Sequence, residues 1–529
     1  MDYPVESFTA EEQALLTPHF TNLDRPVFAL VNLPETVKGA MFARYSRYQG
    51  TLRRMYLDEF AADLPAATAF DGEEGERARK LYERIFLGYG DDSVAQLGGA
   101  HIACEFVSNV MTKLLQRGRL AAYLEQSTRY IPYDSPMGPG LGYRYWRDPV
   151  LGPEYDTAMD SLFDTYSSAL PRVVAWAEDR FPRAPDQPEA AHRGSIRAKA
   201  LDLLRGLLPA ASLSHVGIFA TGQAYEQLLL RLLASPLPEA RDYADMILRE
   251  LKAVMPSFVA RVERPERGGE WVSYLEERAA ASERWAARLG LDRVRRGERS
   301  GPAVRLLAAH GSEDELLAAL LFEAAAASED EARAAVRALP PDERATMLAE
   351  LVGERRNRRH RPGRGLEALR YRFEVVSDYG AFRDLQRHRM LTVQWQTLGP
   401  ELGAGVPEEL EGAGVADSYR AGLELSAAEY ARIAELGRLE LAPYALCLGY
   451  RIRYVLDMNA REAMHLIELR SGREGHPAYR AVAHALHAEI ARVHPAVGAA
   501  MTFVDRDTEP RLERILSEIR AHAKQAARA

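Results

Sequence analysis

Two arginines and a histidine form the densest candidate site, at Arg387-His388-Arg389. Arginine forks bind phosphate or carboxylate oxygens through paired N–H donors. An imidazole between them can stack on, or hydrogen-bond to, a polar ring. The triplet therefore suits an anionic ligand that carries a ring. A solvated basic helix end is the simpler alternative, because cations are stabilised near helix C-termini.

A strand and a short helix are expected to position this triplet. Every second residue from Leu369 to Val375 is apolar and the residues between them are charged, which is the pattern of a half-buried strand. Ser377 or Asp378 can cap the helix that follows and leads to the triplet.

The first half of the chain repeats this order. Arg117-Gly118-Arg119 follows an alternating stretch and a glutamine, as the later triplet does. Ser108 lies nine residues before Arg117, whereas Ser377 lies ten before Arg387, so the register of the two copies differs by one. We interpret the chain as two tandem copies of one domain.

The second copy carries a further polar group on a helix predicted over residues 458–470. Arg461 and His465 are four residues apart and share a helix face, with Asn459 and Arg470 near its two ends. A bound polar ligand explains this grouping on an otherwise apolar helix, although salt bridges between helices would also do so. The first copy has lost the set: when its Gln223 is aligned with Asn459, a leucine stands opposite His465.

The first copy has its own polar segment after the Arg-Gly-Arg triplet. Glu125, Ser127 and Arg129 alternate, so an extended backbone would point all three side chains one way. A carboxylate, a hydroxyl and a guanidinium suit a phosphorylated sugar and a polar base, whereas the plainer interpretation is a polar strand face. In the second copy, Thr397 keeps the hydroxyl and Gly399 replaces the arginine.

Length and charge limit the organisation and the partners. A chain of 529 residues accommodates two domains, which we place at residues 1–260 and 301–529, with a charged helical connector at 261–300. A net charge of −8 argues against general nucleic-acid binding. The basic run Arg355 to Arg364 suggests a polyanion when considered alone, but a loop that grips an anionic cofactor is at least as good an interpretation.

Several features indicate a cytoplasmic location. The N-terminus lacks the basic and apolar regions of a signal peptide, and no apolar run is long enough to span a membrane. Cys104 and Cys447 are too few for a disulfide framework or a cysteine-based metal site, and no metal is expected. Cys104 lies in a strand pattern and is predicted to be in the core.

Taken together, these motifs resemble the flavin-dependent thymidylate synthases (ThyX). That family's signature is Arg-His-Arg, seven residues and then Ser; Arg387-His388-Arg389 with Thr397 nearly meets it. Arg117-Gly118-Arg119 with Ser127 meets it except for the histidine. The polar group from Asn459 to Arg470 is similar to the family's late helix, and the resemblance covers both halves of the chain.

The resemblance implies an α+β fold: two ThyX-like domains, rich in helix, with small antiparallel sheets. It implies transfer of a methyl group to dUMP, giving dTMP, with FAD as cofactor, NADPH as reductant and methylenetetrahydrofolate as carbon donor. FAD-binding residues implied by the resemblance are Arg387, His388, Arg389, Asn459, Arg461 and His465, with Arg117, Arg119 and Ser93 in the first copy. The implied dUMP-binding residues are Glu125, Gln126, Ser127, Arg129 and Arg470, of which Arg470 would favour the ionised uracil and so act in catalysis.

The two copies have lost different parts of this pattern. The first keeps the segment 125–129, and the second keeps the helix 459–470. Family members are homotetramers with shared sites, so we expect one composite site built from both halves, in a homodimer that forms a pseudo-tetramer. Leu114 and Asp384 stand where the family often has glutamine, and Ser93 belongs to a weak match to the family's upstream flavin loop. A non-catalytic flavin- or nucleotide-binding member, or a structural one, is the alternative.

Overall fold

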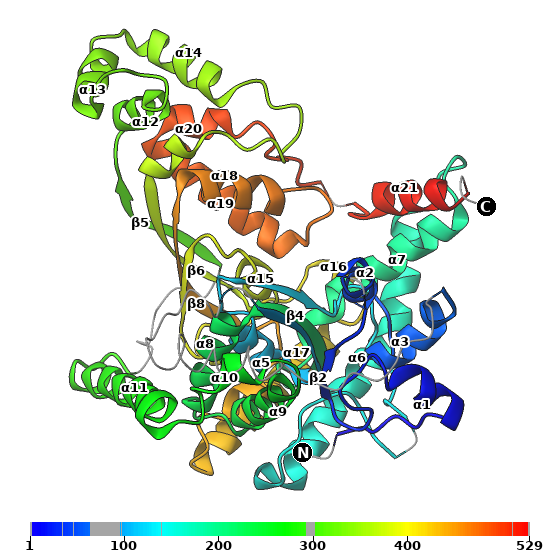
Figure 1. The fold of residues 1–529 in the computed structure, drawn as a ribbon. Helices are drawn as coiled ribbons and strands as arrows, with labels where there is room; N and C mark the ends of the chain where they lie inside the picture. The colour runs from blue at the N-terminus through cyan, green and yellow to red at the C-terminus, as the bar shows by residue number, and fades with distance from the viewer. Residues whose placement is uncertain are drawn as a thin grey trace. The chain divides into compact units, whose positions relative to one another are not determined.

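The computed structural model describes residues 3–33, 35–45, 47–63, 96, 98–138, 140–292, 302–509 and 511–526. They belong to two compact units, each with a four-stranded antiparallel sheet (Figure 1). Unit 1 comprises residues 1–167, 208–298 and 424–447, and unit 2 comprises residues 168–207, 299–423 and 448–529. Each unit therefore contains segments from both halves of the sequence. The predicted α+β fold is confirmed, while the boundaries at 260 and 301 stay a prediction.

The two sheets have the same topology. In each, the first strand lies at one edge and is followed by the second, the fourth and the third. The sheet of unit 1 contains β1 (Val27–Leu30), β2 (Gly99–Ser108), β4 (Leu213–Thr221) and β3 (Ala121–Glu125). The sheet of unit 2 contains β5 (Ala303–His310), β6 (Arg370–Asp378), β8 (Arg451–Asn459) and β7 (Thr392–Trp395). This shared order supports the internal duplication.

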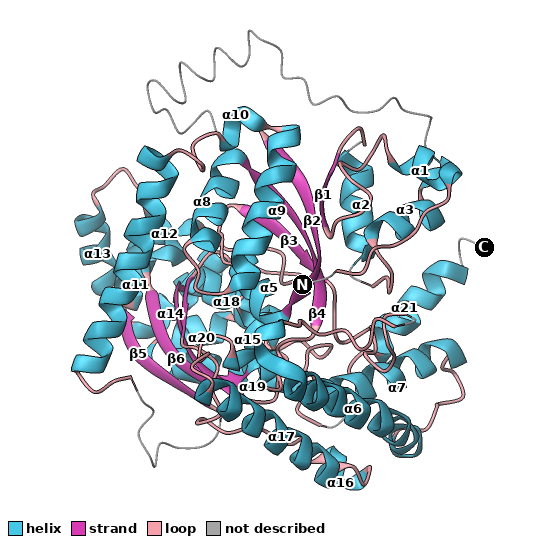
Figure 2. Cartoon of the chain, turned by 90° about the horizontal axis from the view of Figure 1, so that it is seen from below, coloured by secondary structure: helices cyan, strands magenta, loops and turns pink. Residues whose placement is uncertain are grey.

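Helices cover both faces of the sheet of unit 1. Strand β2 is buried along nearly its whole length, as expected for a strand packed on two sides. Ile102, Cys104 and Ile218 pack in one cluster with α8 and α9, which confirms Cys104 as a core residue. Figure 2 shows α8 and α9 beside the strands of this sheet. Phe28 and Leu30 pack in a second cluster with α1 to α3. The helices of this unit are α1 (Ala10–Leu16), α2 (Glu35–Tyr45), α3 (Leu52–Glu59), α5 (Asn109–Leu115), α8 (Gly222–Leu233), α9 (Pro238–Val254), α10 (Pro256–Val259) and α11 (Glu270–Arg288).

The sheet of unit 2 is amphipathic, as the alternating sequence predicts. Tyr371, Phe373 and Val375 of β6 are fully buried, whereas Arg370 and Arg372 on the other face form ion pairs with Asp457 of β8. Helices α18 and α19 lie side by side in Figure 1, and α19 packs on β5 and β6. The helices of this unit are α7 (Glu189–Leu204), α12 (Glu313–Leu321), α13 (Glu329–Arg337), α14 (Pro341–Val352), α15 (Tyr379–Leu385), α16 (Glu409–Gly412), α18 (Ala460–Arg470), α19 (Pro477–Val493), α20 (Pro495–Ala500) and α21 (Ile515–Ala526).

Two long helices each contribute to both units. They are α6 (Gly152–Arg180) and α17 (Ala416–Glu435). Among the described residues, no helix is long and apolar enough to cross a membrane.

Helix caps correct the alignment of the two copies. Ser108 caps α5 by accepting a hydrogen bond from the Met111 N–H, and Asp378 caps α15 by accepting one from the Ala381 N–H. The counterpart of Ser108 is therefore Asp378 and not Ser377. Both caps lie nine residues before the first arginine of their triplets, which removes the offset of one.

The structure also changes the alignment of α8 with α18, by two residues relative to the alignment expected from the sequence. Thr221 caps α8 and Asn459 caps α18, and each residue ends the fourth strand of its sheet. Gln223 therefore corresponds to Arg461, and the expectation that Gln223 corresponds to Asn459 is wrong. The first copy has Gln227 opposite His465 and Leu232 opposite Arg470, so it lacks the histidine and both arginines of the set, although Gln223 and Gln227 keep polar side chains.

Candidate functional site

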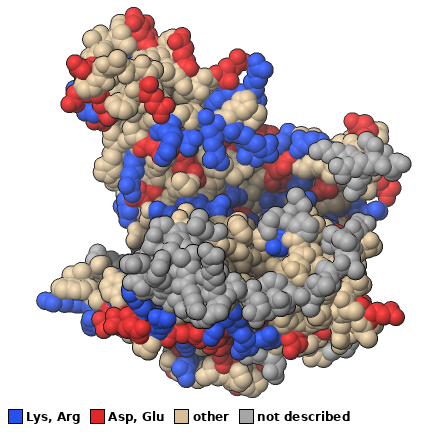
Figure 3. All heavy atoms as spheres, in the orientation of Figure 1, with Lys and Arg blue, Asp and Glu red and all other residues tan. Residues whose placement is uncertain are grey.

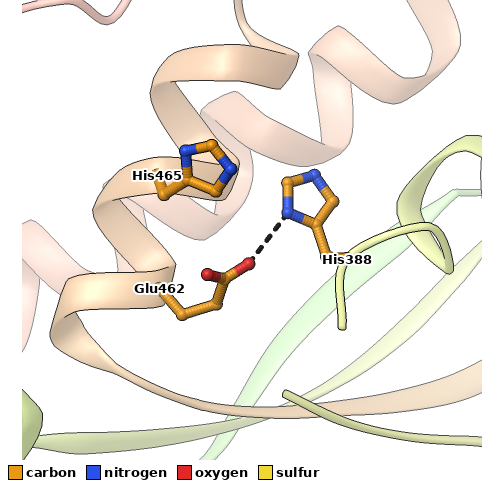
Figure 4. Close-up of side chains that lie close together, drawn as sticks. All are labelled: His388, Glu462 and His465. Carbon is orange, nitrogen blue, oxygen red and sulfur yellow. Dashed lines mark hydrogen bonds and ion pairs between the residues drawn. The ribbon is translucent and has the colours of Figure 1, made fainter. Parts of the chain in front are cut away.

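His388 is the centre of a buried polar cluster in unit 2. It follows α15, and its ring lies between two groups of α18, Glu462 and Arg470. Nδ1 of His388 lies 2.9 Å from Oε1 of Glu462, and the Nε–H of Arg470 donates to Nε2 of His388 at 3.0 Å. The ring of His465, one turn along α18 from Glu462, approaches edge-on at 5.4 Å between centroids (Figure 4). The fold thus brings together three residues that the sequence singled out.

The contacts of His388 define its protonation. Burial, together with the positive charge of Arg470, lowers the pKa of His388 well below its ordinary value, so the ring is neutral near pH 7. Because Nε2 accepts the hydrogen bond from Arg470, the single ring proton resides on Nδ1 and is donated to Glu462. A neutral imidazole therefore links a carboxyl group to a guanidinium.

Burial also shifts the neighbouring groups. It raises the pKa of Glu462, an effect that the nearby His465 and Arg361 oppose. Burial lowers the pKa of His465, and the charges of Arg361 and Arg358 lower it further, while Glu462 acts in the opposite direction.

A metal ion is one ligand that this cluster could accept in principle. His388, Glu462 and His465 place one ligand atom each within 4.8 Å of one another. However, Nδ1 of His388 carries the ring proton and Nε2 accepts from Arg470, and the cations of Arg470 and Arg361 act on the same groups. Positive charge of this density disfavours a bound cation and favours an anionic ligand. We therefore interpret the cluster as part of an anion site.

The other predicted residues of α18 have structural contacts. Asn459 accepts a hydrogen bond from the Glu462 N–H at 2.9 Å and so acts as the helix cap. Arg461 donates to the carbonyl of Pro362 at 3.0 Å and lies 3.5 Å from Glu367. Its side chain is still 29% exposed, so a ligand can reach the guanidinium.

The basic run from Arg355 to Arg364 forms a loop against α18. Arg355 is buried and makes a two-point ion pair with Glu468 of α18. This pair holds the loop in place, and Arg358 and Arg361 are then close enough to shift the pKa of His465. Figure 3 shows a band of Lys and Arg side chains over the part of unit 2 that Figure 1 labels α18 and α19.

The arginines of the triplet flank the cluster. Arg387 is exposed and lies 3.8 Å from Asp384, and Arg389 is also exposed. Burial lowers the pKa of Arg470, and the negative charge of Asp384 opposes this, so the guanidinium keeps its charge. The cluster therefore presents several cations around one neutral histidine.

The first copy cannot form the same arrangement. A Cβ atom at Gly118 would lie 2.6 Å from the hydroxyl of Tyr123 and 3.7 Å from Arg231, so these side chains occupy the space of a histidine ring. Arg117 and Arg119 of this triplet are exposed, as their counterparts are in unit 2.

The segment 125–129 does not present its side chains on one face. Glu125, at the end of β3, is buried and accepts hydrogen bonds from Lys113 at 3.1 Å and Gln116 at 2.9 Å. Gln126 is buried, and its amide donates to the carbonyl of Tyr48. Ser127 is partly exposed, and its hydroxyl accepts from the N–H of Arg129, which is itself buried.

The predicted residues therefore fall into three groups. His388, His465 and Arg470 meet in unit 2, the segment 125–129 lies in unit 1, and Ser93 lies outside the described residues. Roles in binding dUMP or FAD stay predictions for all of them. Glu462 was not predicted from the sequence, although its place between Arg461 and His465 on a capped helix was a usable signal.

Three curated proteins are similar to this chain over more than nine-tenths of its length. A UPF0159 protein of Chlamydia muridarum is 37% identical, with 98% of this chain and 99% of that protein covered. A UPF0159 protein of Chlamydia pneumoniae is 36% identical over 94% of this chain and 96% of its own length. The UPF0159 protein Ta1429 of Thermoplasma acidophilum is 31% identical over 92% and 99%, respectively.

A solved structure and a family model are also similar to this chain. The UMP/dUMP methylase PolB from Streptomyces cacaoi, bound with 5-Br dUMP, is 20% identical; the match covers 40% of this chain and 99% of that chain, with a TM-score of 0.32. The family model of the thymidylate synthase complementing protein matches residues 43–257 and 307–496. The chain therefore belongs to the thymidylate synthase complementing protein family, whose model matches two regions of it.

Proposed function

We propose that this chain is a flavin-dependent thymidylate synthase that methylates dUMP to dTMP. FAD is the proposed cofactor, with NADPH as reductant and methylenetetrahydrofolate as carbon donor. Membership of the family supports this proposal. The observation that carries it is the neutral His388, held between Glu462 and Arg470 among cationic side chains.

The residues of unit 2 fit a flavin nucleotide. Its phosphates carry negative charge, which suits Arg461, Arg358 and Arg361, and its ring system carries polar edges, which suit the imidazoles of His388 and His465. Bound flavin would supply the redox chemistry. The protein would supply phosphate binding and a ring environment in which His388 stays neutral and accepts from Arg470.

Arg470 has the proposed catalytic role. Its Nε–H is held by His388, which orients the guanidinium plane. A cation held at the uracil favours the ionised pyrimidine and so activates its ring carbon. We propose that the segment 125–129 contributes to dUMP binding through Ser127 and Arg129.

The test measures two properties separately: binding of FAD, and reduction of the bound flavin by NADPH. Purified protein is titrated with FAD by visible absorption, and the bound flavin is then reduced with NADPH. We expect a bound flavin that bleaches, with affinity reduced at least tenfold in Arg461→Ala because one charge-assisted contact is lost. Arg305→Ala is the matched control, since Arg305 is an exposed arginine of β5 that pairs with Glu374. Failure of wild-type protein to bind FAD would overturn the proposal.

A non-catalytic member that binds flavin or nucleotide is the second candidate. Two observations favour it: Glu125 is held internally by Lys113, and the amide oxygen of Asn459 is used in capping α18. On this alternative, FAD binds but dTMP is not formed when all substrates are present. Product analysis therefore separates the two candidates.

A further inference from the structure

A second candidate site lies in unit 1, apart from the cluster around His388. It is a cavity of about 340 Å³ between the N-terminal segment, the start of α3 and the loop before α6. Phe106, Met137 and Leu141 provide apolar wall, and Arg144 and His215 provide polar groups. Cavities of this size and composition typically bind small organic molecules.

Among the described residues that line this cavity, Arg144 is the one strongly buried cation. Its residue is 7% exposed, and its guanidinium donates to the amide oxygen of Gln126 at 2.8 Å and lies over the ring of Tyr133. Among the described residues, no carboxylate lies within ion-pair distance of it. A buried cation without an anion is costly, so an anionic ligand would be stabilised here.

His215 adds a second donor at the same place. Its Nδ1 accepts a hydrogen bond from the Phe106 N–H at 3.1 Å, and burial lowers its pKa well below the ordinary value. The neutral ring must then carry its proton on Nε2, which lies 3.4 Å from Nη2 of Arg144. Two donors thus face each other, and an acceptor atom placed between them would satisfy both.

The remaining charges of the cavity cancel. Arg54 and Glu6 also line it, and their charges cancel because they form an ion pair at 2.6 Å. Glu12, the other partner of Arg54, does not line the cavity, so among the lining residues the positive charge of Arg144 is left uncompensated. A single negative charge balances it, whereas a doubly charged phosphate would leave an excess negative charge among apolar groups.

The backbone around the cavity is strained. Phe106 has φ +56°, in the left-handed region, and lies at a bulge where the pairing of β2 with β4 is interrupted. This conformation points its N–H at His215. Backbone strain of this kind is often found at ligand sites.

We propose that this cavity binds a small carboxylic acid with an apolar body, whose carboxylate accepts from Arg144 and from Nε2 of His215. The apolar part packs against Phe106, Met137 and Leu141. This site lies outside the proposed flavin and dUMP chemistry and does not depend on it.

Isothermal titration with phenylacetate and with its neutral analogue phenylacetamide tests the proposal. The full-length wild-type chain should bind phenylacetate at least tenfold more tightly, because only the anion satisfies Arg144. Arg144→Gln should abolish that preference. Arg147→Gln is the matched control, since Arg147 is paired with Asp156 and stacked on Tyr145; it should leave binding unchanged.

Three results would overturn the proposal. They are equal affinity for the acid and the amide, no binding of either compound at millimolar concentration, and unchanged phenylacetate affinity in Arg144→Gln. Displacement of phenylacetate by inorganic phosphate would refute the assigned ligand class. If Arg144→Gln does not fold, the comparison of acid and amide in the wild-type protein decides the question without it.

Discussion

Glu239 provides a quantitative prediction about the stability of unit 1. Its side chain is fully buried near the start of α9 and accepts hydrogen bonds from the N–H and hydroxyl of Ser108, at 2.8 and 2.6 Å. The hydroxyl of Tyr444 donates to it at 2.7 Å. Burial raises the pKa of Glu239 to about 7 from an ordinary 4.5, because these donors offset only part of the desolvation of the charge.

The direction of the pH effect follows from this raised pKa. The folded chain holds the proton more tightly than the unfolded chain, so the stabilising contribution is complete below pH 4.5 and is lost as the pH rises through 7. The difference in pKa corresponds to about 3 kcal/mol of unfolding free energy. Glu239→Gln removes this dependence. Its amide can donate to Ser108 and Tyr444, since both hydroxyls can also accept.

Urea unfolding at pH 5 and at pH 8 measures the effect. The wild-type free energy of unfolding should fall by about 2.5 kcal/mol more than that of Glu239→Gln between these pH values, because most of the contribution is lost in this range. Asp245→Asn, an exposed position on α9, is the control and should follow the wild type. Parallel pH profiles for the wild type and Glu239→Gln would refute the reasoning.

Three further predictions concern both units. Nitrogen NMR should show His388 neutral with its proton on Nδ1 from pH 8 down to pH 6, and a charged ring at pH 7 would contradict the proposed network. Arg355→Ala should lower the free energy of unfolding by about 3–5 kcal/mol, because it leaves Glu468 buried without its partner. Urea unfolding would measure this loss. A loss below about 1 kcal/mol would mean that the ion pair does not hold the loop. Gly118→His should lower the melting temperature, because its Cβ meets the Tyr123 hydroxyl. Combining it with Tyr123→Ala should recover part of the loss. Equal melting temperatures of Gly118→His and the wild type would show that the space is open.

The elements that carry the site could be predicted from the sequence. Alternation of apolar residues located β6, and the run from Asn459 to Arg470 predicted α18 with its polar side chains. Such local patterns depend on neighbours in sequence, and one chain is enough to detect them. The internal repeat was also visible, and the caps Ser108 and Asp378 corrected its register.

Contacts between distant residues could not be predicted. Arg355 and Glu468 are 113 residues apart, and His388 and Glu462 are 74 apart, so no periodic pattern connects them. The alternation of Glu125 with its neighbours indicated a polar face, but the buried Lys113 draws this carboxylate inward. Such pairing depends on the tertiary structure rather than on local preference.

Methylation of dUMP with the help of a flavin is the proposed activity of this chain. Its most direct test is the release of tritium from dUMP labelled at the methylated ring carbon, in the presence of FAD, NADPH and methylenetetrahydrofolate. We predict release that depends on FAD and falls at least a hundredfold in Arg470→Ala, but not in Arg305→Ala. No release by wild-type protein that has bound FAD would contradict the enzymatic function and leave the chain as a flavin-binding member of its family.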